Sequence, residues 1–595
     1  MPDLSRILSA RQPLTFANLA RGAQPLVMAD LARAAKRRAV FIAPDDTAMR
    51  SIADAARFFA PELSVIEFPA WDCLPYDRAS PALSISTQRL SALHRLQSEK
   101  GTPQLLVTTA NAVLQRMLTP FRIREAVREL KPGISIGHES LTQLLQKQGY
   151  SRTDTVIDAG EFAVRGSIFD IFPSGLDQGL RLDFFGDELE SLRLFDPSTQ
   201  RTTGTLDSFL LLPASEVLLE DATIKRFRAG YRERFGANAT QDPLYEAVSE
   251  GRRQAGMEHW LPLFEEKLAT LFDHLGSEDP VAIDAGALTA FEERLSDIAE
   301  YRRTRTETAG QKAGSYRPLD PQALYLTEDE IGGVMEERPV HRATGFDEPE
   351  SDSVIDFGFR SARDFAPERA RGDNVYEVAA EHFRKVGKAG KRPLLAAYST
   401  GSRSRITSIL GEAGTKVALA DSWQDALGKS AKGTPVAMIL PLDSGFSNDD
   451  IELVTEQDLL GDRLVRRRKK RRDSDAFLSE LQALSRGDLV VHTEHGIGKY
   501  LGLEPITVGK SKHDCVMLEY KGGDKLYIPV ENLEVLSRYG SSEDAVMLDK
   551  LGGEAWQKRR ARLRERIREI ASELMRTAAE RALKKAPVLE AEEAS

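Results

Sequence analysis

Cysteine is scarce in this sequence: among 595 residues only Cys73 and Cys515 occur, and neither belongs to a CxxC motif. Disulfide scaffolds and zinc modules need closely spaced cysteines, so both are excluded, and the scarcity fits a reducing compartment. The sequence also lacks an apolar run of the roughly 18 residues that a membrane span requires. Its first 22 residues contain basic side chains but no continuous apolar stretch followed by a cleavage site. We therefore expect a cytoplasmic protein with no membrane contact.

A complete phosphate-binding loop is missing as well. The pattern GxxxxGK[ST] supplies glycines for close backbone approach, a lysine for the phosphates and a hydroxyl for Mg²⁺. The tripeptide Gly428-Lys429-Ser430 matches only its end, since Trp423 stands at the first glycine position. Gly509-Lys510-Ser511 has Glu504 at that position. We interpret both matches as chance.

The place where such a loop belongs, before the first helix, is ANLARGAQPLVMADL. Gly22 is present, but Gln24 and Pro25 stand where phosphate-binding side chains are needed, and no DExH or DExD box follows. The sequence therefore predicts neither ATP hydrolysis nor a bound cofactor.

Other catalytic motifs are equally absent. The nine histidines are scattered, and only His492 and His495 lie close together. On a strand, residues three apart point to opposite faces, so this pair is a poor metal site, and we expect it to make local hydrogen bonds instead. No GxSxG or HExxH motif occurs. We expect no enzyme activity and no metal.

Positive charge is concentrated although the formal net charge is −10. The segment RLVRRRKKRR at 463–472 has eight basic residues in ten, and the region after Glu554 is also basic. Such a run can meet phosphate or an acidic protein surface, or it can be a solvated linker, and the sequence leaves both possibilities open. Any DNA binding by it should be weak and should fall steeply with salt.

Several domains are expected, because one hydrophobic core does not extend over 595 residues. Residues 1–125 alternate helical stretches at 25–38 and 47–59 with short apolar strands at 39–44, 64–68 and 104–109. This alternation is typical of a parallel, doubly wound α/β domain. The segments EFAVRG, SIFDIFP, LRLDFFGD and ELESLRLF within 126–212 predict a sheet-rich α+β insert. Residues 213–349 would complete the first α/β domain.

The second half of the chain predicts further units. The polar stretch at 350–374 is interpreted as an irregular linker. A small α/β domain at 370–460 follows, with helices near 375–387 and 402–413 and strands at 393–399 and 435–441. After a basic linker at 461–484, four or five short strands within 485–542 favour an SH3-like or Tudor-like β-barrel. A long basic helix at 550–586 has one apolar stripe and should pack along another domain.

Three phrases link these domains to a known family. They are FPAWDCLPYDRASP (68–81), GYSRTDTVIDAGEFAVRGSIFDIFPSG (149–175) and LRLDFFGDELESLRLFDPSTQRT (180–202). All three resemble the UvrB-homology module of the bacterial transcription-repair coupling factors. The segment from LLGDRLVRRRKKRR to IPVENLEVLSRY resembles the RNA polymerase-interacting domain that these factors share with CarD-type regulators. The two modules occur in the same order as in the N-terminal half of these factors, so the sequence resembles that half without the ATP-driven translocase.

The resemblance implies specific partners and residues. It assigns UvrA binding to Arg165, Arg181 and Phe185, and positions 181 and 185 would share a strand face. It assigns docking on the RNA polymerase β subunit to the barrel, with Ile506 as the apolar contact and Lys499 and Tyr500 as neighbours. Pro505 and the neighbouring glycines favour an edge strand that adds to a partner's sheet. Phe185 and Ile506 could instead be core residues. The implied protein is a monomeric scaffold for transcription-coupled DNA repair.

Two other functions are considered. A UvrB-like helicase would need the missing lysine, hydroxyl and acidic box, and the aromatic hairpin with which UvrB grips DNA is absent after Asp77. A stand-alone CarD-like transcription regulator would explain the barrel but leave about 480 residues without a role.

Overall fold

The computed structural model describes residues 4–99, 101–236, 240, 242–308, 316–461, 487–492, 495–508, 511–529, 536–540 and 548–551. They belong to two units, 1–466 and 467–595, which we describe separately. The basic run at 463–472 and all but the first two residues of the helix predicted at 550–586 lie outside the described residues.

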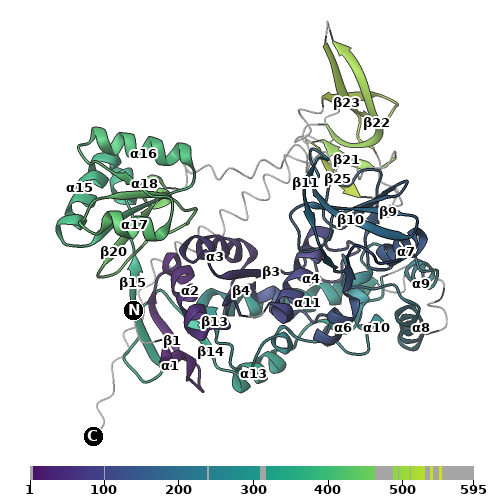
Figure 1. Ribbon diagram of the computed structural model, residues 1–595, viewed down its shortest axis with the longest axis horizontal. Coiled ribbons are helices and arrows are strands. Elements are labelled where there is room, and N and C mark those ends of the chain that lie inside the picture. The colour runs from purple at the N-terminus through teal and green to yellow at the C-terminus, as the bar shows by residue number, and fades with distance from the viewer. Residues whose placement is uncertain are drawn as a thin grey trace. The chain divides into compact units, whose positions relative to one another are not determined.

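The first α/β domain is built on a parallel sheet (Figure 1). The predicted strands at 39–44, 64–68 and 104–109 are confirmed as β2 (Arg38–Ala43), β3 (Ser64–Phe68) and β4 (Gln104–Thr109). Every residue of β2 and β4 is buried, as expected for parallel strands covered on both faces. The remaining strands are β1 (Thr15–Leu19), β13 (Val281–Asp284) and β14 (Val340–Ala343). The main helices are α2 (Gln24–Ala35), α3 (Asp46–Phe59), α4 (Leu83–Ser98) and α11 (Ala285–Thr308).

The second α/β domain continues the same sheet. Its strands are β16 (Arg392–Ala397), β17 (Ala418–Leu419), β18 (Val436–Ile439), β19 (Phe446–Ser447) and β20 (Ile451–Thr455). Its helices include α15 (Val375–Lys388), α16 (Thr400–Glu412), α17 (Trp423–Ser430) and α18 (Glu456–Leu460). The complete order is β17-β18-β16-β20-β19-β15-β1-β14-β13-β2-β4-β3.

The stretch at 350–374 was wrongly interpreted as an irregular linker. It contains β15 (Val354–Ser361) and α14 (Ala366–Arg371), and β15 pairs in parallel with β1 and antiparallel with β19. Ile355, Phe357 and Phe359 are buried and alternate with more exposed residues. An alternation of buried and exposed residues is typical of a strand. It was missed because the polar residues between the apolar ones made the segment resemble a loop.

The insert between β4 and β13 forms a separate six-stranded sheet in the order β11-β10-β9-β8-β7-β6. Its predicted segments are confirmed as β7 (Glu161–Arg165), β8 (Ile168–Ile171), β9 (Gly179–Phe185) and β10 (Glu188–Phe195). The outer strands are β6 (Ser151–Arg152) and β11 (Thr202–Leu206), and α7 (His138–Lys147) precedes them. At the base of the insert, β5 (Arg128–Leu130) pairs with β12 (Phe209–Leu211). Helices α8 (Asp221–Phe235) and α9 (Pro243–Ser249) follow on the return to the first domain.

The second unit contains a five-stranded antiparallel sheet in the order β24-β23-β22-β21-β25. The strands are β21 (Leu489–His492), β22 (Gly496–Val508), β23 (Ser511–Glu519), β24 (Lys525–Pro529) and β25 (Leu536–Gly540). Their number agrees with the predicted four or five strands. Closure into an SH3-like barrel stays a prediction.

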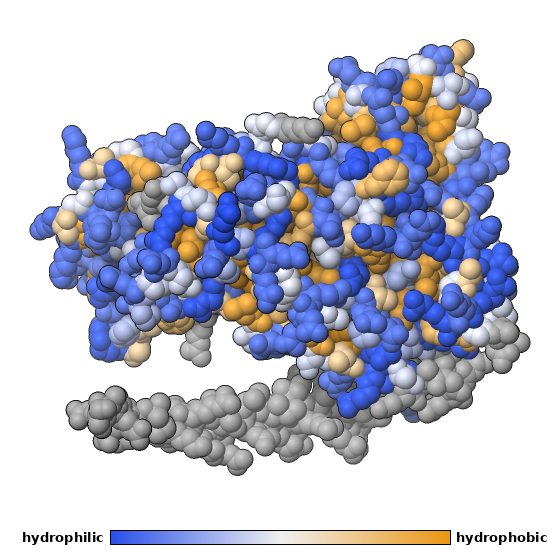
Figure 2. Space-filling view, turned by 90° about the horizontal axis from the view of Figure 1, so that it is seen from below, coloured by the Kyte–Doolittle hydropathy of each residue, from blue (hydrophilic) through white to orange (hydrophobic). Residues whose placement is uncertain are grey.

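The face of the molecule shown in Figure 2 is mainly polar. Hydrophilic residues cover most of the face in Figure 2, and hydrophobic residues form small patches between them. Within the described part of the chain, every helix is too short or too polar to cross a membrane.

Candidate protein-binding surfaces

Arg165, Arg181 and Phe185 share one face of the insert sheet. Residues directly opposite on antiparallel strands lie on the same face, and the register pairs Arg165 with Ile168, Ile168 with Asp183, and Asp170 with Arg181. On β9, Leu180, Leu182 and Phe184 are buried, whereas the alternate positions 181, 183 and 185 are partly or fully exposed. The predicted shared face of Arg181 and Phe185 is therefore present, and Arg165 lies on the same face.

Phe185 is an exposed residue, with 77% of its surface accessible, so it is not part of the core. It ends β9 beside the turn to β10, where Gly186 has φ of 61°. Arg165 ends β7 beside a matching turn at Gly166, also with φ of 61°. Both turns need a left-handed residue, which glycine provides without strain. Arg165 and Phe185 consequently lie at the same end of the sheet.

The arginines of this face are held by partners within the insert. Arg181 donates two hydrogen bonds to the carboxylate of Asp170, at 2.6 and 2.9 Å, and lies 4.8 Å over the ring of Phe195. Arg193 makes the same two-pronged contact with Asp183, at 2.7 Å for both bonds. Arg165 donates to the backbone carbonyl of Asp154 and to Thr155 Oγ1. A guanidinium fixed in this way presents its remaining donors in a defined direction.

Arg193 is a residue that the sequence prediction missed. It lies opposite Arg181 across β9 and β10, on the face just described, and 38% of its side chain is exposed. The spacing within ELESLRLF placed it on a strand but gave no information on which strand lay beside it. We name the set Arg165, Arg181, Phe185 and Arg193 the arginine face.

The residues predicted to contact RNA polymerase lie on β22. Among the described strands, β21 pairs with β22 only from Gly496 to Lys499, whereas β23 pairs with it from Lys499 to Val508. The segment 504–508 is thus paired on one side, in keeping with an edge. Lys499 is half-buried, and Tyr500 is 6% exposed within the small core of this unit. The backbone of Ile506 pairs with His513.

The histidine pair at the start of this unit differs from its predicted geometry. Strand β21 ends at His492, and His495 lies beyond it, so the two rings stack with centroids 4.6 Å apart. The expected local hydrogen bond is confirmed, because the backbone N–H of His495 donates to His492 Nδ1 at 3.2 Å. In the described residues, histidine, cysteine and acidic side chains form no cluster able to hold a metal.

The interior of the first domain contains a cysteine close to a histidine, with 3.8 Å between Cys73 Sγ and His259 Nε2. Burial raises the pKa of Cys73 to about 12 and lowers that of His259 to about 4. The thiol and the imidazole are therefore both held neutral, whereas nucleophilic catalysis needs a thiolate. This pair has the chemistry of a structural contact.

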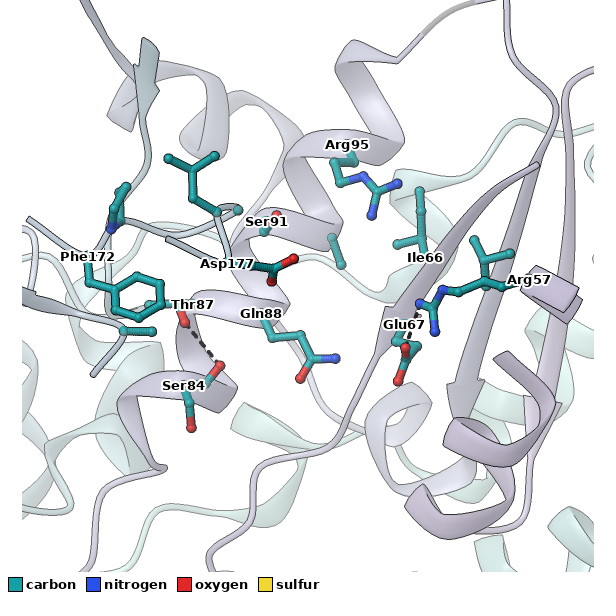
Figure 3. Close-up of a pocket in the computed structure, with 16 residues that line it drawn as sticks. Arg57, Ile66, Glu67, Ser84, Thr87, Gln88, Ser91, Arg95, Phe172 and Asp177 are labelled. Carbon is teal, nitrogen blue, oxygen red and sulfur yellow. Dashed lines mark hydrogen bonds and ion pairs between the residues drawn. The ribbon is translucent and has the colours of Figure 1, made fainter. Parts of the chain in front are cut away.

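A cavity of about 610 Å³ lies between the first domain and the insert (Figure 3). Phe172 and Asp177 of the insert face the α4 residues Ser84, Gln88 and Ser91 across it. At the far side Arg57 pairs with Glu67 at 2.6 Å, and Arg95 pairs with Glu99 at 2.5 Å. Three of the four charged side chains that line the cavity, Arg57, Glu67 and Arg95, are thus in ion pairs.

The chance phosphate-loop match at Gly428-Lys429-Ser430 lies at the end of α17. Lys429 pairs with Asp425 one turn earlier, and the hydroxyl of Ser430 is buried and donates to the carbonyl of Ala426. A helix end with these internal contacts does not form a phosphate loop. In the second match, Gly509 and Lys510 lie outside the described residues.

Three family models match this chain. The UvrB interaction domain matches residues 129–217, which contain the arginine face. The D3 domain of MFD matches 387–459, and the CarD-like/TRCF RID domain matches 484–540. Transcription-repair-coupling factors of Rickettsia bellii and Escherichia coli are both 32% identical to it, over 93% and 92% of this chain. A Bacillus subtilis factor is 27% identical over 89%.

These matches identify the chain as a homologue of the transcription-repair coupling factors. The coupling-factor homologue spans about half the length of the curated relatives it matches: 48% of the Rickettsia bellii factor and 47% of the Escherichia coli factor. The three domains in this order favour a coupling factor over a UvrB-like helicase or a stand-alone CarD-like regulator.

Proposed function

We propose that this chain is a scaffold of transcription-coupled DNA repair. In this role it binds RNA polymerase through the second unit and recruits UvrA to stalled transcription complexes through the insert. The observation that carries the proposal is the arginine face, where three residues assigned to UvrA binding by family resemblance lie on one accessible sheet surface inside the match to the UvrB interaction domain.

The chemistry of the face suits a protein partner. An exposed aromatic ring provides apolar area, and the neighbouring arginines supply oriented hydrogen-bond donors. Aromatic and arginine side chains are enriched among the residues that dominate protein–protein binding energies. The partner should therefore present an apolar pocket for Phe185 surrounded by carboxylate or carbonyl acceptors.

Titration of UvrA onto the full chain tests this assignment. A variant with Arg165→Ala, Arg181→Lys and Phe185→Ala should weaken UvrA binding at least about a hundredfold, because several hot-spot residues are lost together. Lysine is chosen at position 181 because alanine would leave the buried carboxylate of Asp170 without a cation.

A matched control replaces exposed residues of the same types elsewhere. Arg57, Arg252 and Phe346 are two ion-paired arginines and an exposed phenylalanine outside the insert sheet. The control variant Arg57→Ala, Arg252→Ala and Phe346→Ala should bind UvrA like the unaltered chain. Equal affinity of the two triple variants would contradict the assignment.

The RNA polymerase contact is proposed to use the one-sided segment 504–508. Pro505 lacks an N–H and is tolerated at a sheet edge, where a partner strand can pair with backbone groups that no described strand occupies. Ile506→Asp should abolish binding to the β subunit while leaving the melting temperature nearly unchanged. Unfolding of the second unit by this change would instead identify Ile506 as a core residue.

A further inference from the structure

The loop 441–445 of the second α/β domain lies against the start of α2 in the first. In parallel α/β domains, the turn between the first strand and its helix is where phosphate groups bind, because the backbone N–H groups of the helix start point outward there. Here a Cβ added at Gly22 would lie 2.0 Å from the carbonyl oxygen of Ser444 and 3.0 Å from its carbon. The turn after β1 is therefore covered by backbone, without room for a single methyl group.

The polar groups of this region are satisfied within the chain. Gln24, the first residue of α2, donates from Nε2 to Oδ2 of Asp284 at 2.7 Å, and both side chains are buried. Asp284 ends β13, and its other oxygen accepts the backbone N–H of Gly286 at 2.8 Å. The side-chain amide of Gln24 is thus hydrogen-bonded to the carboxylate of Asp284 beside the turn.

The covering loop is itself held firmly. The backbone N–H of Gly445 donates to Asp458 Oδ2 at 2.8 Å, and the same oxygen accepts the N–H of Thr455. Immediately after the loop, Phe446 pairs with Ser361 of β15 and with Leu453 of β20. The end of the loop is consequently held by the hydrogen bond of Gly445 and by the pairing of Phe446 with two strands.

Hydrophobic packing continues this contact. Phe59 of α3 lies edge-on to Trp423 of α17, with ring centroids 4.8 Å apart, and 6.4 Å from the ring of Phe446. All three belong to one hydrophobic cluster that includes residues of both α/β domains. The second domain therefore shares a core with the first.

We propose that the turn after β1, made by Gly22 and by Gln24 with its partner Asp284, is a docking socket for the loop 441–445. The loop takes the place that a nucleotide would take, and it holds the first α/β domain in one conformation without any ligand. The docking socket lies inside the chain, so its test depends on neither UvrA nor RNA polymerase.

Gly22→Ala in the full chain tests the socket, because the new methyl group cannot coexist with the Ser444 carbonyl. We expect backbone amides of 441–447 and of α3 to exchange hydrogen at least about tenfold faster, since both lose their shared contact. Gly332→Ala in α13 (Glu328–Glu337) is the matched control, because the space around Gly332 is open. Unchanged exchange in Gly22→Ala would overturn the proposal.

Trp423→Ala loosens the same contact from the other domain and serves if Gly22→Ala fails to fold. It should accelerate exchange in 441–447 and in α3 together. Acceleration confined to α17 would show that the two domains do not depend on each other and would overturn the socket. Faster exchange in 441–447 on addition of Mg²⁺-ATP would also overturn it, because a nucleotide would then displace the loop.

Discussion

The arginine face and the interior of the first α/β domain both contain ion pairs between an arginine and a carboxylate, but we expect the two pairs to have different roles. On the face, Arg193 and Asp183 form an ion pair whose side chains are 38% and 20% exposed. In the interior, Arg89 and Glu216 form one whose side chains are 0% and 1% exposed. The exposed pair keeps donors available to a partner, whereas the buried pair has every near neighbour inside the chain. The difference separates residues that we expect to affect binding from residues that we expect to affect folding.

The buried ion pair gives the largest expected effect. Glu216 accepts from Arg89 Nε at 2.6 Å and from Trp71 Nε1 at 2.8 Å. Glu216→Gln leaves the Arg89 cation buried without a counter-charge, so it should destabilise the fold by about 3–5 kcal/mol. Asp183→Asn should cost less than about 1 kcal/mol, because water screens its partner. Denaturant unfolding of both variants measures the contrast, and similar losses would break the comparison.

Acid should destabilise the interior through its histidines. His341 stacks on Phe16, its Nδ1 accepts the backbone N–H of Leu14, and burial lowers its pKa from 6.5 to about 4. The unfolded chain takes up a proton at this residue below pH 6.5, whereas the folded chain does so only near pH 4. The free energy of unfolding should therefore decrease as the pH is lowered from 6.5 to 4, by about 2–3 kcal/mol for this residue.

His341→Gln checks this prediction, because glutamine does not titrate. Unfolding free energies of the variant and the unaltered chain at pH 7.5 and 4.5 should show a smaller pH dependence in the variant. An identical pH dependence would mean that the folded and unfolded chains protonate His341 at the same pH, so that burial does not lower its pKa.

The face should respond in binding rather than in stability. Phe185→Ala is expected to weaken UvrA binding about thirtyfold, equivalent to about 2 kcal/mol, with less than about 0.5 kcal/mol lost in stability. Phe346 is 79% exposed, against 77% for Phe185, so Phe346→Ala is a control of equal accessibility. Calorimetric titration distinguishes the two, and a comparable loss with Phe346→Ala would remove the special role of the face.

The smallest expected effect is that of nucleotide on the interior. A ligand that binds only the native state raises the melting temperature, so millimolar Mg²⁺-ATP should leave it unchanged within about 1 °C. Thermal unfolding with and without Mg²⁺-ATP measures this. A clear rise in the melting temperature would show that the chain binds nucleotide and would contradict the docking socket, in which the loop 441–445 fills that position.

Local sequence patterns predicted elements better than contacts between them. The bounds of β3 and β4 were predicted to the residue, because continuous apolar runs mark buried strands. The shared face of Arg181 and Phe185 followed from their spacing on one strand. The partners Asp170 and Asp183 did not, because strand register is fixed by turns and packing that no single segment contains. Gln24 and Asp284 are 260 residues apart, and only the fold brings them together.

Strand β15 also has a mechanical consequence. It joins the two α/β domains into one hydrogen-bonded sheet, so a pull on either domain is transmitted through backbone bonds to the other. Its pairing with β1 includes four registered residue pairs, whereas its pairing with β19 includes two. When the two α/β domains are pulled apart, the backbone hydrogen bonds between β15 and β19 should therefore break before those between β1 and β15.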